Sequence, residues 1–116
     1  MQPQPAAQQA VQIALSNTET IPGRNIKQSL GVVTGSTVRA KHIGKDILQG
    51  FKNIVGGELK GYTELLTEAR NQALQRLVAD AAGRGANAVV NVRFATSAVA
   101  GGAAELFAYG TAVILE

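Results

Sequence analysis

A group of basic side chains near the middle of the chain carries the clearest chemistry that residue type and spacing suggest. Its members are Arg39, Lys41, His42 and Lys45. Clustered positive charges attract phosphates and other anions by counterion release, without reading a base sequence. We therefore predict an anion-binding site at these residues. The alternative interpretation is a solvated surface that keeps the protein soluble.

The only histidine, His42, is the first residue to consider as a metal ligand. The chain has no cysteine, so the other ligands would have to be carboxylates such as Asp46. The neighbouring Lys41 and Lys45 would repel a cation, and we predict no metal site here. Asp46 is explained by its place in the first turn of an expected helix, where the helix dipole stabilises a negative charge.

Enzyme chemistry finds little support in the sequence. The absence of cysteine excludes thiolate catalysis and disulfides. Glycines at Gly31 and Gly35 have the wrong spacing for a phosphate loop, which also needs a lysine that is missing here. Glu64 and Glu68 lie one helical turn apart beside Arg70, as on a solvated helix face. We predict no catalytic residues, no cofactor and no enzymatic activity.

Length and composition indicate one small domain. The chain has 116 residues, of which 46% are hydrophobic, and a formal net charge of +3. Residues 1–9 are rich in Gln and Pro, so we expect a flexible arm there and one folded domain over residues 10–116. No stretch approaches the roughly 18 apolar residues of a membrane span, and the first residues lack the charge of a secretory signal. These features predict a cytoplasmic protein.

Hydrophobic periodicity predicts the elements that must position these side chains. Alternation of apolar and polar residues is typical of strands, and spacing of three and four marks helices. The expected strands cover residues 11–15, 30–41, 88–95 and 105–115, and the expected helices cover residues 43–55 and 62–82. Gly83 and Gly85 should end the second helix. The β-β-α-α-β-β order predicts a two-layer α+β fold, with a mainly antiparallel sheet and two consecutive helices on one face.

The last expected strand is apolar on both faces. One of these faces carries Phe107, Tyr109, Thr111, Val113 and Leu115. A strand with one solvent-exposed face would alternate polar and apolar residues, so we expect both faces of this strand to be covered. The two helices cover one face only, and we expect a neighbouring copy of the chain to cover the other. These five residues are therefore the predicted contact surface between subunits.

An ordered set of short motifs between positions 20 and 113 resembles a known family. The motifs are Thr20-Ile21-Pro22-Gly23-Arg24 with Ile26, Leu30-Gly31-Val32-Val33-Thr34-Gly35, Lys45-Asp46, Ile54-Val55-Gly56-Gly57, Tyr62, Ala69-Arg70, Gly85-Ala86-Asn87-Ala88-Val89-Val90 and Gly110-Thr111-Ala112-Val113. In this set the chain is similar to the YbjQ-like family of small bacterial proteins of unknown function, which also carries a heavy-metal-binding label. The resemblance implies a subunit like that of dodecin, in a homopentameric ring.

The chain departs from the family where acidic residues are common. Ser36 replaces a frequent glutamate, and Arg93 and Ala95 replace an acidic pair on the third strand. The leading hypothesis is a non-enzymatic homopentameric structural or binding module whose partner is itself. The alternatives are a ring that binds an anionic ligand, with nucleic acid the less favoured choice, and a metal or small-ligand site at subunit junctions.

Overall fold

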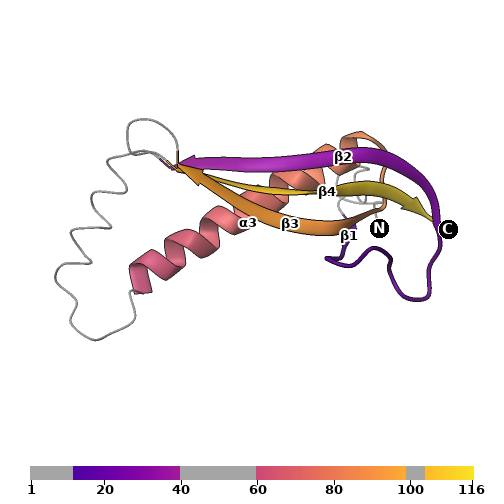
Figure 1. Ribbon diagram of the computed structural model, residues 1–116, viewed down its shortest axis with the longest axis horizontal. Coiled ribbons are helices and arrows are strands. Elements are labelled where there is room, and N and C mark those ends of the chain that lie inside the picture. Colours follow the sequence, from indigo (N-terminus) through magenta and orange to yellow (C-terminus); the bar gives the residue numbers. More distant parts are fainter. Residues whose placement is uncertain (1–11, 40–59, 99–103) are drawn as a thin grey trace, which may run out of the picture.

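The described part of the chain forms a four-stranded sheet with a long helix on one face. The computed structural model describes residues 12–39, 60–98 and 104–116. The elements in these ranges are β1 (Ala14–Leu15), β2 (Ile26–Arg39), α3 (Lys60–Gly83), β3 (Ala88–Ala98) and β4 (Ala104–Leu115) (Figure 1). The α+β class predicted from the sequence is confirmed.

The strands lie in the order β1-β3-β4-β2. β4 pairs antiparallel with both β2 and β3, whereas β1 pairs parallel with β3. The sheet is therefore mixed, with its two long ladders antiparallel. β4 lies between two partners, so both of its edges are hydrogen-bonded within the sheet.

The described ranges contain one helix, where the sequence predicts two consecutive ones. The expected helix over residues 62–82 falls within α3, and the expected helix over residues 43–55 lies outside the described residues. β2 begins at Ile26, ahead of the expected start at residue 30. Its register shifts between Ser29 and Gly31, and Gly31 has a positive φ of 92°. This irregularity interrupts the alternation by which a strand is recognised in a sequence.

α3 ends in a Schellman motif at the predicted position. The Ala86 N–H donates to the carbonyl of Ala81, and the Gly85 N–H donates to the carbonyl of Ala82. Gly85 has a φ of 82°, which glycine adopts without the steric penalty of a side chain. The turn sends the chain directly into β3.

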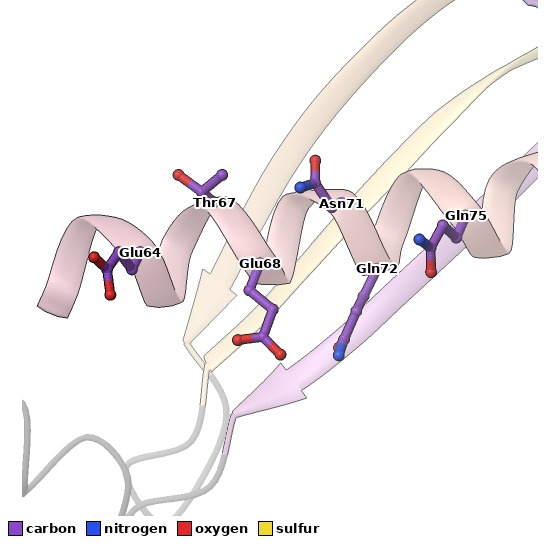
Figure 2. Close-up of a pocket in the computed structure, with 6 residues that line it drawn as sticks. All are labelled: Glu64, Thr67, Glu68, Asn71, Gln72 and Gln75. Atoms are coloured by element: carbon purple, nitrogen blue, oxygen red, sulfur yellow. The ribbon is translucent and has the colours of Figure 1, made fainter.

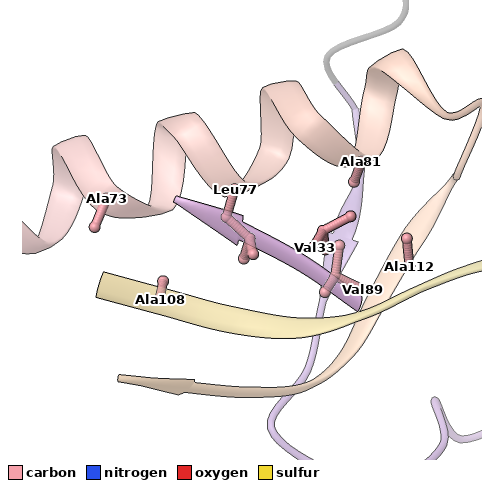
Figure 3. Packing of buried hydrophobic residues seen from close by; sticks show 7 residues of the cluster. All are labelled: Val33, Ala73, Leu77, Ala81, Val89, Ala108 and Ala112. Atoms are coloured by element: carbon pink, nitrogen blue, oxygen red, sulfur yellow. The ribbon is translucent and has the colours of Figure 1, made fainter. Parts of the chain in front are cut away.

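Small side chains bring α3 very close to the sheet. Its buried stripe consists of Ala69, Ala73, Leu77 and Ala81. Leu77 packs with Val33 and Val89 in one cluster between the two layers (Figure 3). A β-carbon added at Gly35 would lie 2.2 Å from the carbonyl oxygen of Ala73. The helix backbone therefore rests on the strand backbone at Gly35.

A second cluster lies on the opposite side of the sheet, which we call the outer face. It consists of Ala88, Val90, Val113 and Leu115, with Ile21 packed against them. Ile21 belongs to the connection between β1 and β2, so this connection covers one end of the outer face.

Asn87 joins the start of β3 to the end of β4 through its side chain. Its Oδ1 accepts from the Leu115 N–H at 2.7 Å, and its Nδ2 donates to the Leu115 carbonyl at 3.2 Å. Its own backbone N–H donates to the carbonyl of Val113. The amide side chain therefore extends the ladder by one pair of hydrogen bonds.

Candidate functional site

An uncovered apolar area lies on the outer face beside the part that Ile21 covers. We call it the outer patch, and it consists of Val32, Val38, Arg93, Phe107 and Tyr109. Val32 is 63% exposed, Val38 59% and Tyr109 37%. β2, β3 and β4 all contribute, because Arg93 and Thr34 each pair with Tyr109 across the sheet. Side chains at paired positions point to the same face, which places Arg93 beside Tyr109 and puts Val32 and Val38 on the same face of β2 as Tyr109.

The centre of the outer patch is aromatic and is bordered by a cation. The ring centroids of Phe107 and Tyr109 lie 5.6 Å apart, and the interplanar angle is 36°. Arg93 is held at the border by a 2.7 Å hydrogen bond from its Nη1 to the carbonyl oxygen of Asn17. Aromatic residues and arginine are enriched in the centres of protein interfaces, so this composition suits contact with another protein surface.

The residues predicted to contact another subunit divide into two groups. Val113 and Leu115 are 1% and 4% exposed and are already covered within the chain, by the cluster that includes Ile21. Phe107 and Thr111 are half-buried and Tyr109 is exposed. The argument for a covering partner therefore applies to the part of β4 that holds these three residues.

The predicted anion-binding residues lie at and beyond the end of β2. Arg39 is the last residue of the strand and pairs with Ala104. Lys41, His42 and Lys45 lie outside the described residues. The described geometry therefore places one member of the cluster, and anion binding stays a prediction.

Acidic side chains do not gather into a metal site in the part of the chain that the structure describes, where no three His, Asp or Glu residues come together. Glu64 and Glu68 lie on an open groove of about 520 Å³ along α3 (Figure 2). The other residues of this groove are Thr67, Asn71, Gln72 and Gln75. Two carboxylates on an exposed helix face supply fewer ligands than a bound cation normally takes.

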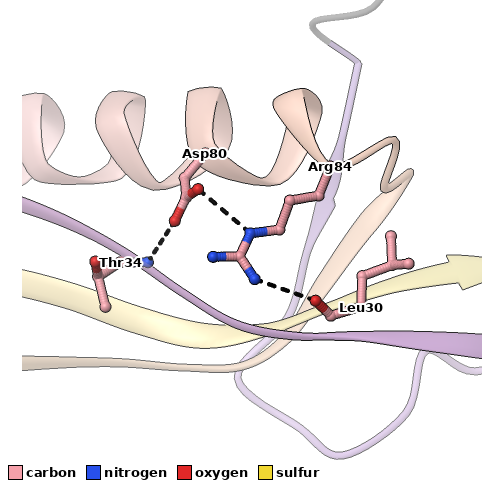
Figure 4. Close-up of polar contacts among 4 residues, drawn as sticks. All are labelled: Leu30, Thr34, Asp80 and Arg84. Atoms are coloured by element: carbon pink, nitrogen blue, oxygen red, sulfur yellow. Dashed lines mark hydrogen bonds and ion pairs between the residues drawn. The ribbon is translucent and has the colours of Figure 1, made fainter.

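Two charged residues of α3, Arg76 and Asp80, and Arg84 just after its end hold the outer edge of β2. Asp80 accepts from the Thr34 N–H at 3.2 Å and forms an ion pair with Arg84 at 3.4 Å (Figure 4). Arg84 also donates from Nη1 to the carbonyl of Leu30 at 3.2 Å, and Arg76 donates to the carbonyl of Ser36.

These contacts occupy backbone groups that an edge strand would otherwise offer to another strand. Sequence reasoning missed this role, although the spacing of four residues from Arg76 to Asp80 to Arg84 places them on one side of the helix. Only the fold shows that this side meets β2.

In residues 12–39, 60–98 and 104–116, no helix is both long enough and apolar enough to span a bilayer.

The fold and the site together define a small α+β protein with a sheet that is covered on one face and partly open on the other. The family model described as "Putative heavy-metal-binding" matches residues 13–116. The chain therefore belongs to this YbjQ family, as its motifs suggest.

Relatives over most of the chain carry the name UPF0145 protein. The one from Hahella chejuensis is 67% identical over 102 residues, which are 88% of this chain and 98% of that protein. The one from Archaeoglobus fulgidus is 61% identical over 105 residues, covering 90% and 97%. Since relatives also occur in archaea, the description of the family as bacterial is too narrow.

A solved structure has a similar fold. It is a protein of unknown function from Pediococcus pentosaceus, with a TM-score of 0.58 and 14% identity. The match covers 90% of this chain and 98% of that chain. At this identity the likeness concerns the fold alone.

Proposed function

We propose that the protein is a non-enzymatic module that assembles with copies of itself through the outer patch, as a homopentameric ring of dodecin-like subunits. The observation that carries this proposal is the exposure of Val32, Val38 and Tyr109 on one face of the sheet. Burial of apolar surface contributes about 25 cal/mol per Å², so exposed apolar side chains on one face favour association.

The edge of β2 favours contact through the face of the sheet. Asp80, Arg84 and Arg76 bind backbone groups of this edge, which hinders the addition of a further strand there. The outer patch has no such cover among the described residues. A partner therefore gains more by packing on the face than by pairing with the edge.

Native mass spectrometry of the purified protein tests this proposal. The expected spectrum shows five subunits, and Val38→Asp should shift the protein to smaller species by placing a charge in the contact. Gln28→Asp is the matched control, because Gln28 is an exposed residue of the same strand outside the outer patch. A wild-type monomer at micromolar concentration would contradict self-assembly.

The same spectrum tests a second candidate, a metal or small ligand bound where subunits meet. The family description favours this candidate. A retained ligand would appear as added mass on the assembly, and that mass would disappear together with the assembly in Val38→Asp. Added mass that persists on the monomer would place the ligand within a single chain.

A further inference from the structure

We draw no further inference here: the strongest candidate, the edge of β3 beyond Val92, where no further strand pairs within the described residues and Phe94 is 42% exposed, carries nothing because nothing in the structure shows what covers it.

Discussion

At the scale of single residues, Asn87 shows how a side chain takes the place of backbone. Its amide exchanges two hydrogen bonds with Leu115, as a residue of a neighbouring strand would do. The motif that contains Asn87 is part of the family resemblance, yet residue order alone does not say what the asparagine contacts. Its partner is 28 residues away and is brought near only by the antiparallel pairing of β3 and β4.

Replacing Asn87 by alanine should lower the free energy of unfolding by about 1–3 kcal/mol, because both backbone groups of Leu115 lose a partner in a half-buried place. Urea denaturation followed by circular dichroism measures this change. Asn17→Ala is the matched control, since the contact described for Asn17 uses its backbone carbonyl and its side chain is exposed. Equal effects of the two substitutions would contradict the role given to the Asn87 amide.

Asn91 illustrates a residue-scale feature that periodicity hides. It has a φ of 56°, and the register of β3 shifts between Val90 and Arg93. Asparagine tolerates this left-handed conformation better than most residues. The shift lets the Asn91 N–H reach the carbonyl of Thr18, so that the segment after β1 continues along β3. A regular alternation of apolar residues, which the sequence analysis assumed, cannot predict such a bulge.

At the scale of elements, the contact between α3 and β2 depends on the absence of a side chain at Gly35. Glycine within a strand allows another backbone to approach closely. The helix is the partner, and its alanine-rich stripe allows the contact. The amphipathic spacing of residues 62–82 was sufficient to predict the helix itself.

Gly35→Ala should lower the free energy of unfolding by about 3 kcal/mol or more. The new β-carbon would meet the backbone of Ala73 and Leu77 at 2.2 and 2.3 Å, and packed backbone cannot move aside cheaply. Gly83→Ala is the control at the end of the same helix, where an added β-carbon meets no atom within 4 Å. It should be neutral or stabilising by up to about 1 kcal/mol. A small loss at Gly35 in thermal unfolding would contradict the described packing.

The pairing of elements could not be predicted from the sequence. Periodicity identified four strands but not that β1 joins β3 in parallel, because the two are separated by most of the chain. The same limit applies to the site. The apolar faces of β4 indicated that a second cover is needed, whereas the fold shows that Ile21 supplies part of it.

At the scale of the whole molecule, anion binding by the basic residues at and beyond the end of β2 remains a prediction that heparin chromatography can test. If Arg39, Lys41, His42 and Lys45 bind anions, the protein should bind heparin and elute as salt rises, since salt competes for the released counterions. Lys41→Gln should lower the salt concentration of elution, whereas Lys27→Gln, at an exposed position of β2 outside the cluster, should leave it nearly unchanged. Absence of retention at low salt would remove the anion-binding alternative.

The order of the strands also has a consequence for folding during synthesis on the ribosome. β2 ends at Arg39, and its ladder partner β4 begins at Ala104, 65 residues later (104 minus 39). At about 5–20 residues per second, β2 waits roughly 3–13 s for that partner. During this time its valines are exposed to solvent and to other nascent chains. α3 is made earlier and binds the outer edge of β2, so it can shield this strand while synthesis of β4 is still under way.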